Sequence, residues 1–157
     1  MSDSGSGTWE YKIIVGGNTL IQSTGQRYYV IETLGYDNPQ DASVLMLRSN
    51  SSAVYFYNGF GNEHLVFQNA PIGTKWTYES GHCEVQEREI EAVETVTVPA
   101  GTFEGCLKFV QRCLSDDPIA IYTREWIKPG FGMVQEIDYY GGVNPPRVKK
   151  LKSWTLF

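Results

Sequence analysis

The sequence contains few of the residues that build metal and nucleophile sites. Only three cysteines and two histidines occur among its 157 residues, and they lack the close pair spacing of a structural zinc site. His82 and Cys83 are adjacent, but neighbours on a strand point to opposite faces and do not converge on one atom. The chain has neither a glycine-rich phosphate loop ahead of a helix nor a nucleophile elbow. We therefore expect no metal ion and no cofactor.

Long hydrophobic runs and an excess of basic charge are absent as well. No apolar stretch approaches the roughly 20 residues needed to cross a bilayer, so no transmembrane segment is expected. The formal net charge is -5, whereas nucleic-acid binding demands a basic surface, so no nucleic-acid partner is expected. The one basic run, at 147–152, alternates with apolar residues and therefore indicates a strand.

Aromatic residues and turn residues are plentiful. Aromatics make up 13% of the chain, and 16 glycines and 7 prolines are spread along it, which is typical of many short strands joined by tight turns. The predicted fold is an all-β antiparallel meander that forms a strongly curved sheet or open β-barrel of about nine strands. Residues 1–7 are predicted to be a flexible polar tether and residues 8–157 a single β domain. A hairpin turn is predicted at Gly16-Gly17-Asn18.

Residues 83–114 predict two long antiparallel strands joined by the Pro-Ala-Gly-Thr turn at 99–102. The first part of this stretch is rich in glutamate, which favours a helix by propensity, but its apolar positions form no helical stripe. With the chain turning between Val98 and Gly105, Glu94 lies opposite Phe109 on the apolar face. Desolvation there would raise the pKa of Glu94, which makes it the candidate acid or base.

The same register predicts where the cysteines lie. Cys106 and Cys113 are on one strand, point to opposite faces and are about 23 Å apart. Cys83 lies opposite the region of Ile119, well outside the roughly 4.4–6.8 Å between Cα atoms that a disulfide accepts. Three free thiols are therefore predicted, and the cellular compartment stays open.

Glu87, Glu89 and Glu91 alternate along the first of these strands and share one face. A cation site or an acid/base cluster is one interpretation, because oxygen ligands suit calcium and close carboxylates raise one another's pKa. A solvated surface is the other. The predicted register places Arg112 opposite Glu91, which favours the solvated surface.

Three turn segments occur in a fixed order along the chain. They are the loop at 67–76, which contains Pro71, Gly73 and Trp76, the Val-Pro-Ala-Gly-Thr-Phe turn at 98–103, and the Pro-Gly-Phe-Gly-Met-Val segment at 129–134. In these segments the chain resembles a group of uncharacterised bacterial envelope proteins and lipoproteins, although Trp126-Ile127 stands where that group usually has paired tyrosines. The group is similar in fold to the outer-membrane lipoprotein carriers, in which a bent sheet encloses an apolar hollow. The resemblance implies an open barrel and carries over no catalytic residue.

Aromatic residues at strand positions exceed what a small core needs, which favours a ligand-binding hollow lined by rings. Core packing is the simpler interpretation for any one of them. The expected lining residues are Trp9, Tyr11, Tyr55, Tyr57, Trp76, Tyr78, Trp126 and Tyr139.

Three functions of different classes follow from these observations. The leading hypothesis is a non-catalytic envelope protein that binds an apolar or amphipathic small molecule or lipid in the concave face of its sheet. The second is a protein–protein interaction or structural module, with a second copy of itself as one partner. The third is a small enzyme that uses the cavity with Glu94 as acid or base. The expected location is the bacterial cell envelope, periplasmic or lipid-anchored, with the cytoplasm as the alternative.

Overall fold

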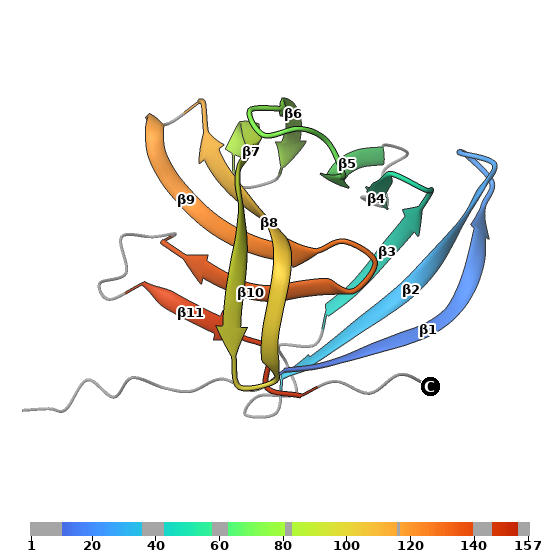
Figure 1. Cartoon of the computed structure of the whole chain (residues 1–157). Coiled ribbons are helices and arrows are strands. Elements are labelled where there is room, and N and C mark those ends of the chain that lie inside the picture. Colours follow the sequence, from blue (N-terminus) through green and yellow to red (C-terminus); the bar gives the residue numbers. More distant parts are fainter. Residues whose placement is uncertain are drawn as a thin grey trace, which may run out of the picture. The chain divides into compact units, whose positions relative to one another are not determined.

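The computed structural model describes residues 11–35, 43–57, 63–80, 83–115, 117–139 and 146–153. The described residues form strands and turns and no helix, and every strand pair is antiparallel (Figure 1). This confirms the predicted all-β antiparallel class. The predicted strand number is wrong, because these residues contain eleven strands in two sheets. The tether at 1–7 lies outside the described residues.

The chain divides into two compact units, Met1–Gln68 and Asn69–Phe157. Each unit holds one of the two sheets, so each is described by itself. None of the described residues form a helix long and apolar enough to cross a membrane.

The first unit contains a five-stranded sheet whose spatial order follows the sequence. Its strands are β1 (Tyr11–Ile21), β2 (Gln26–Gly35), β3 (Ser43–Ser49), β4 (Ala53–Tyr57) and β5 (Glu63–Gln68). The predicted hairpin turn at Gly16-Gly17-Asn18 is wrong, because β1 continues through it with a bulge between Val15 and Asn18. The chain turns later, at 22–25, where Gly25 has a φ of 65° that favours glycine.

One face of the first sheet holds a polar network around Tyr28, whose side chain is fully buried. The Tyr28 hydroxyl and the Arg48 guanidinium both donate hydrogen bonds to the Glu63 carboxylate. The hydrogen bonds from Arg48 lower the pKa of Glu63, and burial raises the pKa of Tyr28. This network satisfies a buried hydroxyl and a partly buried ion pair, as a stable interior requires.

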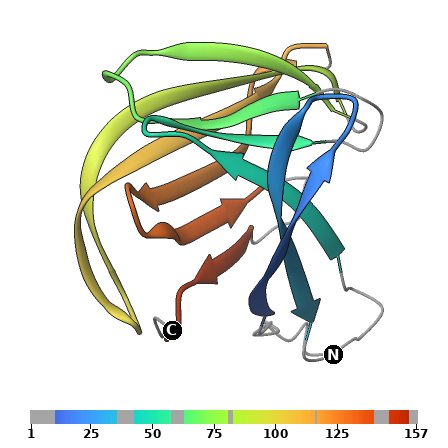
Figure 2. The same cartoon turned by 90° about the vertical axis from the view of Figure 1, so that its right-hand side faces the viewer.

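The second unit contains a six-stranded sheet in the order β11-β10-β9-β8-β7-β6. Its strands are β6 (Lys75–Ser80), β7 (Cys83–Val98), β8 (Gly101–Cys113), β9 (Asp117–Lys128), β10 (Gly132–Asp138) and β11 (Arg147–Lys150). The basic run at 147–152 thus begins with a strand, as predicted. The long strands β7 and β8 bend together along their length (Figure 2).

The β7–β8 hairpin is present as predicted, but its register differs. Val96 lies opposite Phe103 and Glu94 lies opposite Cys106, because the chain turns tightly through residues 99 and 100 instead of through a longer loop. A bulge between Glu94 and Val96 shifts the register by one residue, and a second bulge between Ile90 and Ala92 shifts it back. Each bulge inserts a residue that breaks the strict alternation of faces on which the prediction depended.

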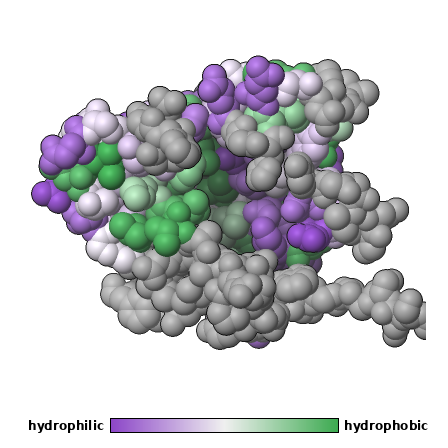
Figure 3. All heavy atoms as spheres, turned by 180° about the vertical axis from the view of Figure 1, so that it is seen from behind, coloured by the Kyte–Doolittle hydropathy of each residue, from purple (hydrophilic) through white to green (hydrophobic). Residues whose placement is uncertain are grey.

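The hydrophobic core of the second unit is formed by side chains from β7, β8, β9 and β10. It comprises Val96, Val98, Cys106, Trp126 and Val134, with Ala100, Phe103, Ile137 and Leu151 packed against it. The Ala100 N–H donates to the Leu151 carbonyl at 3.2 Å, and the Leu151 N–H donates to the Val134 carbonyl at 2.9 Å. The tip of the β7–β8 hairpin is therefore fastened to the segment after β11. Elsewhere apolar side chains also reach the surface in groups (Figure 3).

Candidate functional site

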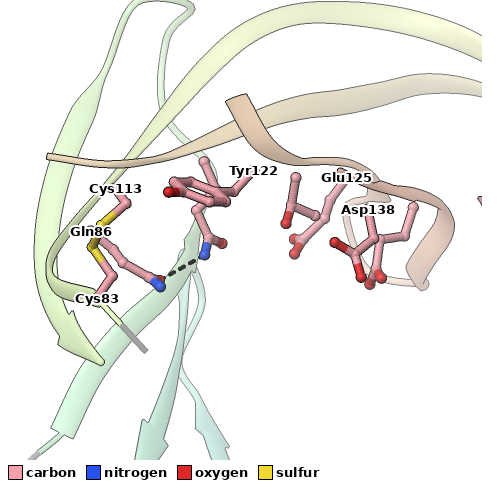
Figure 4. A pocket seen from close by; sticks show the side chains of 9 residues that line it. Cys83, Gln86, Cys113, Tyr122, Glu125 and Asp138 are labelled. Atoms are coloured by element: carbon pink, nitrogen blue, oxygen red, sulfur yellow. Dashed lines mark hydrogen bonds between the residues drawn. A yellow bond between two sulfur atoms is a disulfide. The ribbon is translucent and has the colours of Figure 1, made fainter. Parts of the chain in front are cut away.

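A hollow of about 350 Å³ opens on one face of the second sheet. It is lined by Cys83, Gln86, Gln111, Cys113, Tyr122, Thr123, Glu125, Glu136 and Asp138, which come from β7, β8, β9 and β10. Figure 4 shows the two cysteines and Gln86 on one side, and Glu125 and Asp138 on the other. The volume lies within the range of ordinary small-molecule sites.

A disulfide forms one side of the hollow. Cys83 and Cys113 are bonded, with Cα atoms 5.8 Å apart, so the prediction of three free thiols is wrong. The observed register brings Cys113 opposite Gln86, and Cys83, three residues earlier, departs from the regular ladder, so that its Cα lies 5.8 Å from that of Cys113. Only Cys106 is free, and its burial raises the pKa of the thiol.

Two glutamines lie beside the disulfide and hold each other in place. The Gln111 Nε2 group donates to Gln86 Oε1 at 2.7 Å. An amide has two N–H donors and a carbonyl acceptor, so the pair keeps hydrogen-bonding capacity beyond this one bond. Tyr122 also lines the hollow, and its ring is drawn near Gln86 in Figure 4. This side of the hollow therefore combines an aromatic ring, sulfur atoms and amide groups.

Carboxylates form the opposite side. Glu125 of β9 and Glu136 of β10 lie directly opposite each other in the strand ladder, and Asp138 lies opposite Thr123. Two like charges in that position repel unless cations offset them. Arg88 and Lys149 supply that charge, Arg88 by an ion pair with Glu125 and Lys149 by an ion pair with Glu136 at 2.5 Å.

Arg88 is unusual because it is a charged residue in the interior. Its side chain is only 3% exposed, and its guanidinium also lies 5.4 Å from the centre of the Phe109 ring. Removing a charge from water is costly unless it is paired. The ion pair with Glu125 is therefore what allows Arg88 to remain there, and it fixes the Glu125 carboxylate at the hollow.

The eight aromatic residues predicted to line a hollow are divided between the two units and the residues outside the described part of the chain. Tyr55 and Tyr57 belong to the first unit, where the Arg48 guanidinium lies 4.1 Å from the centre of the Tyr55 ring and Tyr57 packs on Tyr28. Trp9 lies outside the described residues, and Tyr11 is placed only as the first residue of β1.

The four predicted residues of the second unit are not among the residues that line the hollow, although Tyr78 lies opposite Gln86 in the ladder and the Tyr139 N–H donates to the Tyr122 carbonyl. Trp76 packs edge-on against Phe109, and the Tyr139 hydroxyl accepts a hydrogen bond from Arg124 at 2.7 Å. Tyr78 lies on β6, where burial raises its pKa. Trp126 belongs to the core of the second unit. Trp126 therefore packs in the core, which was the simpler of the two roles considered for each aromatic residue.

Glu94 differs from its prediction in both neighbour and pKa. It lies opposite Cys106 and accepts a hydrogen bond from the Trp126 indole N–H at 2.7 Å. This bond, together with Lys108, lowers the pKa of Glu94, although desolvation acts in the opposite direction. With 39% of its side chain exposed, Glu94 lacks the desolvated setting that made it a candidate general acid.

Replacing Trp126 with phenylalanine is expected to raise the pKa of Glu94 toward its ordinary value of 4.5, because the main hydrogen bond to the ionised form is lost. A lowered pKa in the folded state means that the ionised carboxylate stabilises the fold at higher pH. That contribution disappears as the pH falls through the folded-state pKa. A ¹³C NMR titration of the Glu94 carboxyl group measures the shift. An unchanged titration curve in the variant would contradict the assignment of the indole as the main cause.

The glutamates at alternate positions of β7 bind cationic side chains of the protein itself. Arg112 and Lys75 each pair with both Glu87 and Glu89. Lys108 pairs with Glu91 at 2.8 Å. These contacts favour the surface interpretation over an acid/base cluster, with Arg112 opposite Glu87 and not Glu91 as predicted.

None of the nine residues that line the hollow was among the predicted lining residues, because their signal in the sequence is not local. Glu125, Glu136 and Asp138 belong to two strands, and only the ladder pairing places them side by side. The one available signal was an alternation of polar residues at 136 and 138 on β10, which indicates a polar face but not a cavity. The disulfide could not be predicted without the correct pairing of β7 with β8.

Comparison with known proteins gives one similarity. A DUF3108-like family model, which represents an uncharacterised family, matches residues 70–143. The matched stretch lies within the second unit and contains every residue that lines the hollow. No curated protein and no solved structure matches the chain. The second unit is therefore the part of the chain that is similar to a known family.

Proposed function

We propose that this protein is a non-catalytic binding protein and that its second unit holds a small amphipathic ligand in the hollow. The observation that carries the proposal is the mixed lining of a single space of about 350 Å³. Binding sites of this size combine apolar surface with a few placed polar groups. The hollow offers both, on sides that face each other (Figure 4).

The lining favours a particular kind of ligand. An apolar or aromatic part would contact the Tyr122 ring and the Cys83–Cys113 sulfur atoms, while the polar end would meet Glu125 and Asp138. Carboxylates attract ammonium groups and repel carboxylates. We therefore expect amphipathic amines to bind better than neutral ligands, and anionic ligands to bind worst.

The proposal places the protein in the bacterial cell envelope, and the disulfide supports this location. Disulfides persist in oxidising compartments such as the periplasm and are rare in the cytoplasm. The resemblance to envelope proteins whose bent sheets enclose a hollow supports the same location and an open-barrel architecture. A binding role also agrees with the lack of the desolvated carboxylate on which the enzyme hypothesis depended.

Dansylcadaverine is a suitable probe because it joins a fluorescent aromatic ring system to a primary amine. Its fluorescence is expected to rise saturably on titration with the full chain, with a dissociation constant in the micromolar range. Thr123→Trp places a large ring in the hollow and is expected to weaken binding by roughly tenfold or more. Thr102→Trp makes the same substitution at an exposed position of the distant hairpin tip and is expected to leave binding unchanged.

The charge preference is tested with two probes that share the dansyl ring. Neutral dansylamide is expected to bind more weakly than dansylcadaverine, and anionic dansylglycine more weakly still. Raising the salt concentration should reduce the difference, because screening weakens interactions between exposed charges. Equal affinity of wild type and Thr123→Trp for dansylcadaverine would refute the site, and tighter binding of dansylglycine would refute the preference.

A further inference from the structure

The disulfide occupies a particular place in the wall of the hollow. Cys83 is the first residue of β7 and Cys113 is the last residue of β8. The ladder between these strands ends where Gln86 lies opposite Cys113, so Cys83 lies beyond the last pair. Besides the disulfide, the backbone bond from the Leu114 N–H to the Val85 carbonyl, at 2.8 Å, joins this end of β7 to β8.

The other strand beside Cys83 is β6. Cys83 lies opposite Ser80 of β6, past a bulge in that pairing, and β6 is the last strand at its side of the sheet. Edge strands make fewer contacts than central ones and open more easily. The disulfide is the covalent connection between the start of β7 and the end of β8, and the Val85 N–H adds a hydrogen bond to Ser115 Oγ at 3.4 Å.

A hydroxyl group lies beside both sulfur atoms. Ser115 Oγ is 3.3 Å from Cys83 Sγ and 3.4 Å from Cys113 Sγ. If the disulfide is reduced, each sulfur becomes a thiol that can donate a weak hydrogen bond, and the Ser115 oxygen can accept one. Reduction thus leaves the separated thiols with a nearby polar partner.

We propose that the Cys83–Cys113 disulfide controls ligand binding by the hollow, which binds in the oxidised protein and releases its ligand on reduction. This inference rests on the proposed binding function. The reductant is a dithiol. One of its thiolates attacks a cysteine sulfur, the S–S bond breaks and a mixed disulfide forms. The second thiol of the reductant then displaces the remaining cysteine, which leaves two protein thiols and an oxidised reductant.

Reduction weakens binding through the shape of the wall. Both cysteines and Gln86 line the hollow, so separating the sulfur atoms loosens three of its contact residues together. Apparent affinity falls in proportion to the fraction of molecules that keep the competent shape. We expect dansylcadaverine to bind the reduced protein roughly tenfold more weakly or worse.

The test compares oxidised protein with protein treated with dithiothreitol, in the full chain and in the Cys106→Ala variant, which keeps the disulfide and removes the third thiol. Tight binding by the oxidised form and weak binding by the reduced form supports the inference. Equal binding by both forms overturns it and leaves the proposed function intact. Absence of binding by the oxidised form overturns the proposed function itself.

A kinetic measurement separates release of the ligand from unfolding. Dithiothreitol is added to protein loaded with dansylcadaverine, and probe fluorescence and far-ultraviolet circular dichroism are followed together. Probe release before any loss of strand signal supports redox control. Release that coincides with the loss of strand signal shows that the disulfide acts on the whole fold, and this outcome overturns the inference.

Discussion

Replacing Cys83 and Cys113 together with serine is expected to lower the free energy of unfolding by about 3.5 kcal/mol. The disulfide spans 30 positions of the sequence, and its loss restores freedom to the unfolded chain that the crosslink had removed. A loss of this size should lower the melting temperature by roughly 10 °C. Chemical denaturation under oxidising conditions measures the difference directly.

Thiol counting and a matched variant test the same bond independently. Denatured, unreduced protein should show one reactive thiol, that of Cys106, and reduced protein should show three. Cys106→Ala removes a buried sulfur but leaves the crosslink, so it is expected to cost only about 1 kcal/mol. Three reactive thiols in the unreduced protein, or equal stability of wild type and the double serine variant, would falsify the crosslink.

Replacing Arg88 with methionine is expected to destabilise the second unit by about 3 kcal/mol. Methionine has similar length and can keep the contact with Phe109, so the change removes mainly the charge. Glu125 then keeps its negative charge beside Glu136 with its main counter-ion gone. Urea denaturation at neutral pH measures the loss.

A double-mutant cycle separates the charge from the packing. Arg88→Met combined with Glu125→Gln leaves no unpaired charge, so most of the lost stability should return. Lys75→Met is the surface control, because Lys75 forms exposed ion pairs with Glu87 and Glu89 that contribute little. If the double variant is as unstable as Arg88→Met alone, the interpretation of Arg88 as a paired interior charge is wrong.

The local chemistry of the β7–β8 hairpin was predictable, and its register was not. Pro99 presets a turn conformation, Gly101 adopts a φ of 132°, and valine and threonine favour strands, so the two strands were evident. Extending the pairing over their full length assumed strict alternation. The bulges near Ala92 and Val96 break it locally and offset each other, whereas the tighter turn displaces the pairing along its whole length, and every conclusion about facing residues carried that displacement.

Predicting the candidate site also required knowledge of which residues face each other on neighbouring strands. A correct partner for Cys113 would have brought Cys83 within three residues of it, and the pairing of Glu125 with Glu136 would have led to the carboxylate side of the hollow. Neither follows from the residue types. Aromatic content likewise predicted a hollow without indicating which face each ring occupies, and Trp126 fills the core because its strand turns that face inward.

The hydrogen bond between Ala100 and Leu151 has a consequence for how the second unit assembles. Strands β8 to β11 lie between these two residues in the chain. Each neighbouring pair of strands can form through a short connection, but this bond requires the ends of a long loop to meet, which is entropically unfavourable until the intervening strands are in place. We therefore expect closure at the hairpin tip to be a late event in folding, after the ladder from β8 to β11 has formed.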